Sequence, residues 1–394
     1  QGRLRNLLIV AETALSLVLL VGAGLLIRTF SNLMRTDPGF ATKGVLSGQI
    51  WLTGTRYDTP TSISAYYDRL TGALTALPGV ESAAVVEAGL PLQRGGNLGV
   101  FVGGDFKASA DYRTITPGYF DVLKVPLTAG RRFSAADREG AEPVAIVNQT
   151  FAHRVLGEGD PLGQLIKLGG GSDAPRRVVG VVRDVRSFIG FPAPPTAFIP
   201  SAQTPVDFTR IYSSWFPTHV VLRTAGDPDA LSLLLAKTIR ETDPQVPVGR
   251  IRSMSSVLGE SLAFQRFLML LLTLFAGLAI VLAAVGLYGV MSYLVTQRTG
   301  EIGIRMALGA RGAEVRRMVL GRGLRLTGLG VGAGLIGAAG LTRLLGSQLY
   351  GVEALDPGTF GLVAAVLLGV GLLACYLPAR RATLVDPIVA LKNE

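Results

Sequence analysis

The sequence predicts an α+β membrane protein with four transmembrane helices and one large extracytoplasmic α/β domain. Apolar residues make up 49% of the 394 residues and charged residues 17%, which is a composition unlike that of a soluble enzyme or a disordered chain. Four apolar stretches are membrane-spanning candidates. The long segment between the first two stretches repeats a strand–helix–strand pattern, which predicts a split βαβ sheet.

The residue counts narrow the class of protein further. At roughly 150 residues per domain, the chain has room for two or three folded units. The single cysteine, Cys375, excludes a disulfide framework and any multi-cysteine zinc or iron–sulfur site. Two histidines are too few for the usual metal clusters. We therefore expect no bound metal.

The net charge of +10 raises the question of nucleic-acid binding. Residues 31–262 carry 23 basic and 21 acidic residues, so their net charge is only +2. The other 15 basic and 7 acidic residues contribute +8 and flank the apolar stretches, as membrane topology predicts. We therefore expect a lipid bilayer, and no nucleic acid, as the partner of this charge.

The four apolar stretches span residues 7–27, 267–287, 326–341 and 360–377. The first has 21 residues, which at about 1.5 Å each would cross a hydrocarbon core of about 30 Å. A cleaved signal peptide is the alternative for this stretch, but it is longer than a typical signal core and no small-residue cleavage site follows it. The third stretch is shorter and rich in glycine, and the fourth ends before Pro378.

The basic residues of the short loops predict the orientation in the membrane. The connection 346–359, between the third and fourth stretches, carries two acidic residues and no basic one. Arginines are concentrated between the second and third stretches, and basic residues flank both chain ends. We therefore predict that the arginine-rich loop between the second and third stretches and both termini are cytoplasmic, and that residues 31–262 are extracytoplasmic. The loop arginines are Arg298, Arg305, Arg311, Arg316, Arg317, Arg322 and Arg325.

The first strand–helix–strand unit lies at the start of the extracytoplasmic segment. Residues 45–52 and 80–86 are typical of strands, and a helix begins between them at Thr59, as N-cap, and Pro60. Pro78-Gly79 ends this helix. Its apolar residues follow helical spacing: Ile63, Tyr66, Tyr67, Leu70, Leu74 and Leu77.

The second unit lies far downstream. Strands are predicted at 219–222 and 246–251, with a helix that begins at Asp227-Pro228 and ends at Asp243-Pro244. The two units together predict one split βαβ sheet.

The segment 90–216 between the two units predicts an inserted, mainly β subdomain. Short β-like runs alternate there with loops rich in glycine and proline. A short helix is expected with Asn148 as N-cap and Gly157 as its end. The predicted strands include 144–147, 178–182 and 197–199, and the helix is 149–156.

The sequence contains no motif for nucleotide hydrolysis or other catalysis. GxxxxGK[ST], HExxH, GxSxG and paired CxxC are all absent, so we expect neither an enzyme nor a cofactor-binding site. Glu12, inside the first stretch, is expected to face another helix or water, because a carboxylate that faces lipid is costly. A GxGxxG match lies within the third apolar stretch, where closely spaced small residues favour helix packing over dinucleotide binding. The packing glycines are Gly328, Gly330, Gly332, Gly334 and Gly337.

The most distinctive segment is residues 301–310, in the predicted cytoplasmic loop. It is typical of a short helix that ends at Gly309, with apolar side chains beside an i,i+4 pair of Glu301 and Arg305. This combination favours docking into a groove of a partner protein. A basic loop that rests on anionic lipid is the alternative. The segment is Glu301, Ile302, Gly303, Ile304, Arg305, Met306, Ala307, Leu308, Gly309 and Ala310.

With these residues the chain resembles the FtsX-like permeases, the membrane subunits of MacB-type and lipoprotein-releasing ABC transporters. EIGIRMALGARGAEVRRMVLGRG at 301–323 is similar to the coupling-helix signature of the family, and YLPARRATLVDPIVAL at 376–391 to its C-terminal signature. Residues 115–133 and 147–168 resemble the MacB-like periplasmic core domain.

The resemblance implies a permease subunit in a bacterial inner membrane that works by mechanotransmission. A separate cytoplasmic ATPase would bind ATP and push on residues 301–310, and the periplasmic domain would move in export or envelope remodelling. Two permease units would pair, as a homodimer or as fused halves, and a periplasmic or outer-membrane partner is compatible with this scheme. The alternative is a membrane-anchored signalling or regulatory protein that controls an envelope enzyme without transport.

The chain departs from the macrolide-exporter pattern at its start. No ATPase domain precedes the first apolar stretch, and the chain begins with Gln1 and not Met. We therefore expect a processed chain or a fragment, such as the second half of a duplicated permease.

A continuous helix over 264–297 would be about 50 Å long and could act as a stalk that transmits movement. The predicted organisation is 1–30 for the N-terminal flank and first transmembrane helix; 31–262 for the periplasmic core domain, split into 31–89 with 217–262 and the insert 90–216; 263–297 for the stalk and second helix; 298–325 for the coupling loop; and 326–394 for the last two helices and the tail.

Overall fold

The computed structural model describes residues 2–52, 55–93, 95–169, 174–297, 304, 308, 312–344 and 349–383. The chain divides into two compact units. The membrane unit comprises Gln1–Arg35 and Phe264–Glu394, and the α/β unit comprises Thr36–Ala263.

The first layer of the α/β unit is an antiparallel sheet with the strand order β11-β1-β10-β2. Strands β1 and β2 are joined through helix α2, and strands β10 and β11 through helix α6. Strand β10 lies between β1 and β2, and strand β1 lies between β11 and β10. This arrangement is the split βαβ sheet that the sequence predicts. The elements are β1 (Val45–Ile50), α2 (Pro60–Thr75), β2 (Val80–Glu87), β10 (Thr218–Thr224), α6 (Ser232–Thr242) and β11 (Val248–Ser253).

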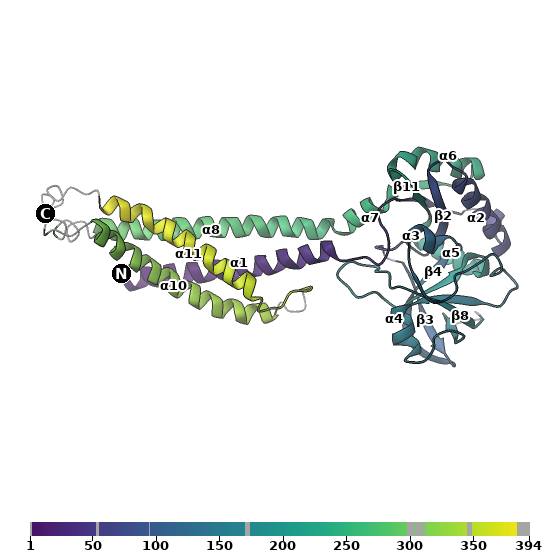
Figure 1. The fold of residues 1–394 in the computed structure, drawn as a ribbon, viewed down its shortest axis with the longest axis horizontal. Helices are drawn as coiled ribbons and strands as arrows, with labels where there is room; N and C mark the ends of the chain where they lie inside the picture. The colour runs from purple at the N-terminus through teal and green to yellow at the C-terminus, as the bar shows by residue number, and fades with distance from the viewer. Residues whose placement is uncertain are drawn as a thin grey trace. The chain divides into compact units, whose positions relative to one another are not determined.

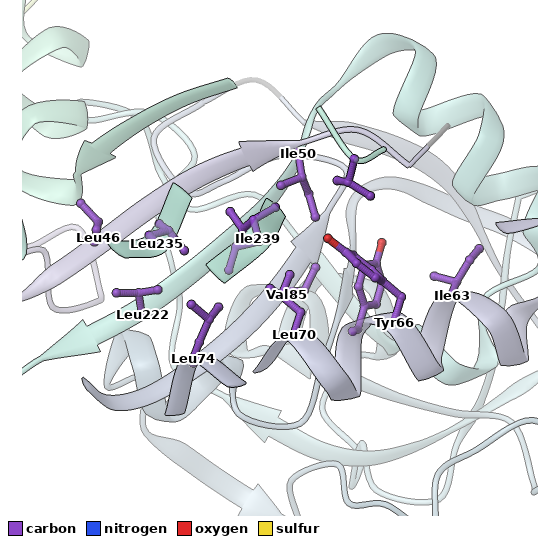
Figure 2. Packing of buried hydrophobic residues seen from close by; sticks show 14 of the residues in the cluster. Leu46, Ile50, Ile63, Tyr66, Leu70, Leu74, Val85, Leu222, Leu235 and Ile239 are labelled. Carbon is purple, nitrogen blue, oxygen red and sulfur yellow. The ribbon is translucent and has the colours of Figure 1, made fainter. Parts of the chain in front are cut away.

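Helix α2 begins where its capping residues predict. The Ser62 amide donates to Thr59 Oγ1 at 3.1 Å, and Pro60 occupies the first turn. The predicted apolar stripe is buried except for Leu77, which packs at its edge. Figure 2 shows Leu70 and Leu74 directed at the sheet that carries Leu222. Because α2 and α6 pack against the same core, this cluster holds the split βαβ layer together.

The inserted subdomain is mainly β, as predicted, and it closes on itself. Among the described residues, six strands form a ring in the order β4-β3-β7-β8-β6-β9, and a parallel pairing of β9 with β4 closes it. Strand β5 pairs with the end of β8. The strands are β3 (Gly96–Val102), β4 (Asp105–Ile115), β5 (Leu127–Gly130), β6 (Val144–Asn148), β7 (Leu165–Leu168), β8 (Arg176–Val182) and β9 (Thr196–Pro200).

The insert is joined to the first layer by strand β4. Thr114 and Ile115, at the end of β4, pair with β2, while the earlier residues of β4 pair with β3. The two parts therefore share one continuous sheet. The predicted short helix is present as α4 (Gln149–Phe151), which continues as one π-helical turn (Ala152–Leu156).

The other helices of the α/β unit lie around these two layers. They are α3 (Tyr119–Leu123), α5 (Val206–Trp215) and α7 (Met254–Ser261), with 3-10 turns at Thr55–Tyr57, Ser201–Gln203 and Pro228–Leu231. Neither α5 nor the β3–β4 hairpin was expected from the sequence.

Among the described residues of the membrane unit, four helices are long and apolar enough to cross a membrane. Figure 1 shows their lengths, which exceed the apolar stretches that predict them. The polar flanks remain helical because a helix satisfies its own backbone hydrogen bonds wherever it leaves the bilayer. The helices are α1 (Gly2–Arg35), α8 (Ala263–Gln297), α10 (Gly312–Leu344) and α11 (Pro357–Ala382).

Two helix bounds differ from the sequence prediction. The arginine-rich residues from Gly312 onward are the first turns of α10, because Val315, Val319 and Leu326 give them one buried face. Helix α11 continues through Pro378. A proline so close to the C-terminal end of a helix removes only one backbone donor, and few turns remain to be disturbed.

Candidate functional site

The predicted coupling segment joins two long helices of the membrane unit, α8 and α10. The structure describes only Ile304 and Leu308 of its ten residues. The Leu308 amide donates to the Ile304 carbonyl at 3.0 Å, a helical spacing. Leu308 is 83% exposed and Ile304 is 49% exposed. The other residues lie outside the described part of the chain: Glu301, Ile302, Gly303, Arg305, Met306, Ala307, Gly309 and Ala310.

Basic side chains surround this end of the membrane unit. The start of α10 lies beside the end of α11, where a Cβ on Gly312 would be 3.5 Å from the side chain of Thr383. Arg316 and Arg317, in the first turns of α10, are exposed. At the end of α11, Arg381 donates from Nη1 to the hydroxyl of Tyr288 on α8 at 2.9 Å. The segment thus presents exposed apolar side chains next to a cationic surface.

Two of the predicted packing glycines lie directly against helix α1. A Cβ on Gly330 would be 2.6 Å from Thr13 Cβ, and a Cβ on Gly334 would be 2.9 Å from Leu17 Cβ. Such distances leave no room for a side chain, so α1 and α10 approach closely here. Gly337 has a looser contact, at 3.4 Å from Val18.

The other two predicted packing glycines lie elsewhere on α10. Apart from the neighbouring backbone of α10 itself, no described atom comes within 4 Å of a Cβ built on Gly328 or Gly332.

Further close approaches in the membrane unit involve glycines that the sequence analysis did not single out. A Cβ on Gly286 of α8 would fall against the carboxylate of Glu12, so this carboxylate faces another helix, as expected. Gly323 of α10 lies in the same way against Cys375. Gly371 of α11 lies against Thr327, at 2.9 Å. These glycines are not arranged in a repeating motif, and only the packed structure reveals them.

The opposite end of the membrane unit is held by polar contacts. Arg28 of α1 forms an ion pair with Asp356, whose side chain also caps α11 by accepting from the Thr359 amide at 2.8 Å. Asn32 Nδ2 donates to the Gly351 carbonyl at 3.0 Å. The 349–356 connection is therefore fastened to α1, which limits separation of α1 and α11 at this end.

Glu87, at the end of strand β2, is one of three buried carboxylates among the described residues of the α/β unit, with Asp137 and Asp243. The Tyr67 hydroxyl on α2 donates to Oε1 of Glu87, and Thr209 Oγ1 on α5 donates to its Oε2 at 3.2 Å. Burial raises the pKa of Glu87 to about 7, although the Tyr67 and Thr209 hydrogen bonds act in the opposite direction. The carboxyl group of Glu87 thus links β2 to α2 and α5 by hydrogen bonds.

The described residues contain no cluster of three or more metal-ligating side chains. The expectations that the chain binds no metal and carries no catalytic site stay predictions.

Comparison with known protein families matches nearly the whole chain. The model of the MacB-like periplasmic core domain matches residues 8–237, and the model of the FtsX-like permease C-terminal matches residues 273–387. The boundary between the two matches falls near the start of α8, where the α/β unit ends.

The relatives found among curated proteins are exporters. The pyoverdine export ATP-binding/permease protein PvdT of Pseudomonas syringae pv. syringae (strain B728a) is 29% identical over 82% of this chain and 47% of its own length. The macrolide export ATP-binding/permease protein MacB of Azoarcus sp. (strain BH72) is 31% identical over 68% of this chain and 40% of its own length. The chain thus spans about half the length of the curated relatives it matches.

Among solved structures, the periplasmic region of MacB from Actinobacillus actinomycetemcomitans covers 58% of this chain and 97% of its own, with 14% identity and a TM-score of 0.39. The family models carry the assignment, since the first alone matches more than half of the chain. The chain belongs to the FtsX-like permease family with a MacB-like periplasmic core domain.

Proposed function

We propose that the chain is the permease subunit of an ABC transporter of the MacB/FtsX type. A separate cytoplasmic ATPase hydrolyses ATP, and the permease converts the ATPase movement into movement of the α/β unit. The observation that carries this proposal is the exposed Leu308 and Ile304 on a short segment between two long membrane helices. Exposed apolar side chains at helical spacing suit docking into a groove of a partner.

The charge distribution supports an orientation with the coupling segment in the cytoplasm. Arg316, Arg317, Arg380 and Arg381 lie at the end of the membrane unit where the segment lies. The connection at the other end carries Asp356 and no basic residue. By the positive-inside rule, the arginine-rich end faces the cytoplasm and Thr36–Ala263 lies in the periplasm.

Helix α8 is the element best suited to transmit movement. It runs without interruption over 35 residues from the α/β unit to the coupling segment, a rise of about 52 Å. Its buried residues form one stripe at intervals of four, so it packs along a single edge: Ala279, Ala283, Leu287 and Met291. A helix held along one edge can slide or tilt at lower cost than one buried on several faces.

The names of the relatives suggest the kind of substrate. They are described as exporters of pyoverdine and of macrolides. We propose export of a small molecule or envelope remodelling as the activity, with a second permease unit to complete the transporter. That unit would be a second copy of this chain or the other half of a duplicated permease.

The docking segment can be tested with one charged substitution. Leu308→Asp should abolish recovery of the ATPase with the affinity-tagged full chain purified from native membranes, because a carboxylate cannot enter an apolar groove without a large desolvation cost. Leu233→Asp is the matched control, since Leu233 is 86% exposed on α6 of the α/β unit. Unchanged ATPase recovery with Leu308→Asp would contradict the proposal.

A further inference from the structure

Helices α8 and α11 leave an apolar groove of about 420 Å³ on the surface of the membrane unit. Several of its side chains are largely exposed, and Leu373 is 71% exposed. The groove is lined on α8 by Val281, Val285 and Tyr288, and on α11 by Val370, Leu373 and Leu377.

One end of this groove is polar. Tyr288 is the last lining residue on α8, and its hydroxyl accepts a hydrogen bond from Arg381. Arg381 follows Leu377, the last lining residue on α11, by one helical turn. Arg380 and Arg381 are both exposed. Two guanidinium groups and a phenol proton are therefore available to an anion at this end of the groove.

The groove and the arginines at its end together match the depth of one lipid leaflet. Arg381 follows Val370, the first lining residue on α11, by eleven residues, a rise of about 16 Å. Half of a hydrocarbon core of about 30 Å is about 15 Å. With Arg380 and Arg381 in the headgroup region of one interface, Val370 at the other end of the groove would therefore lie near the middle of the bilayer.

The charge at its end selects the occupant of the groove. An acyl chain is narrow and apolar, and a phosphate headgroup complements two arginines.

We propose that this groove binds an anionic phospholipid, with one acyl chain between α8 and α11 and the headgroup phosphate at Arg380, Arg381 and the hydroxyl of Tyr288. The lipid would fill the side of α8 that the protein leaves uncovered and fasten α8 to α11. The inference goes beyond the transport proposal and does not depend on it.

The test is lipid retention by the full chain reconstituted in nanodiscs of phosphatidylcholine with a minor fraction of phosphatidylglycerol. After gentle extraction, mass spectrometry should find about one phosphatidylglycerol per chain. Arg381→Ala should lower this retention roughly tenfold, because it removes a charge-assisted hydrogen bond. Arg317→Ala removes an exposed arginine at the same end of the membrane unit and should leave retention unchanged. Equal losses in both variants would show diffuse attraction to the surface and overturn the proposal.

A second pair of variants shows whether lipid retention is lost because the groove is blocked or because the protein is misfolded. Val285→Trp should fill the groove and lower retention while both arginines remain. Leu270→Trp adds the same ring at an exposed position of α8 outside the groove and should have no effect. In a Cys375→Ala background, a disulfide between two chains carrying Val285→Cys would show that a second permease unit covers the groove, which would also overturn the proposal.

Discussion

Helix α2 of the α/β unit and helix α8 of the membrane unit place their apolar residues in opposite ways. Helix α2 has 16 residues and buries five of them in the core of the split βαβ layer. Helix α8 has 35 residues and buries four. In water an apolar face must be buried within the protein, whereas in a bilayer lipid tails are as apolar as leucine. The core therefore determines the position of α2, while α8 is placed by a narrow stripe and a few close approaches.

This difference also exists within the membrane unit. In the most apolar part of α1, 39% of the residues are buried inside the protein, compared with 6% in α8. Helix α1 lies against the glycines of α10 and is tied to Asp356 at one end. Helix α8 is thus the least constrained of the four long helices among the described residues, which agrees with its proposed part in transmitting movement and in binding lipid.

The largest effect is expected in the core of the α/β unit. Leu70 is completely buried between α2 and the sheet, so Leu70→Ala should lower the free energy of unfolding by about 2–5 kcal/mol. Leu233 lies on α6 and is 86% exposed, so Leu233→Ala should change it by less than about 0.5 kcal/mol. Thermal or chemical unfolding of the full chain in detergent measures both. Similar losses at the two leucines would mean that the layer is not held by this core.

A second prediction concerns the buried Glu87, whose pKa is raised from 4.5 to about 7. The folded protein binds this proton more tightly than the unfolded chain, so the stabilisation is complete below about pH 4.5 and is lost as the pH rises through about 7. The loss should amount to about 3 kcal/mol. Glu87→Gln keeps an oxygen acceptor for Tyr67 and removes the titration, so it should abolish this loss.

The measurement is the difference between the unfolding free energies of the wild type and Glu87→Gln from pH 4.5 to 8. The difference is needed because His219 titrates in the opposite direction. Burial, with Arg252 nearby, lowers the pKa of His219 to about 3, so its contribution is complete above about pH 6.5 and is lost as the pH falls. A difference that does not vary with pH would show that Glu87 is ionised in the folded protein throughout this range.

The sequence predicted the split βαβ layer well because its signals are local. Thr59 and Pro60 start α2, and the apolar spacing from Ile63 to Leu74 identifies its buried face. The closure of the insert was not predictable in this way. The parallel pairing of β4 with β9 joins segments about 85 residues apart, and no local pattern encodes such a pairing. The hydrogen bonds of Glu87 likewise come from three elements that are distant in sequence.

In the membrane unit the sequence predicted the number of helices, the length of α8 and two of the glycine contacts of α10, but not the extent of α10 or most other contacts. Hydropathy reports which residues tolerate lipid, so it missed the polar turns that extend α10 back to Gly312. The coupling segment was identified by its resemblance to a family motif, and most of it lies outside the described residues. The bond between Tyr288 and Arg381 depends on the packing of α8 against α11, which neither helix encodes alone.

The smallest expected effect on the unfolding free energy concerns the contact between α10 and α1. It tests whether the close approach of the two helices, and not the apolar area between them, holds α1 in place. A Cβ on Gly334 would be 2.9 Å from the Ala14 carbonyl oxygen and 2.9 Å from Leu17 Cβ. Gly334→Leu should therefore push α1 away from α10 and lower the unfolding free energy by about 1–3 kcal/mol.

Gly332→Leu is the matched control, since no described atom outside the neighbouring backbone of α10 lies within 4 Å of its added Cβ and leucine favours the helix over glycine. It adds the same apolar side chain two residues away on α10. Unfolding of the full chain in mixed micelles with increasing SDS measures both variants. If packing determines the position of α1, only Gly334→Leu destabilises the chain. Equal destabilisation by the two variants would show that α10 is packed on all sides, and the contrast between a tightly seated α1 and a loosely held α8 would then lose its physical basis.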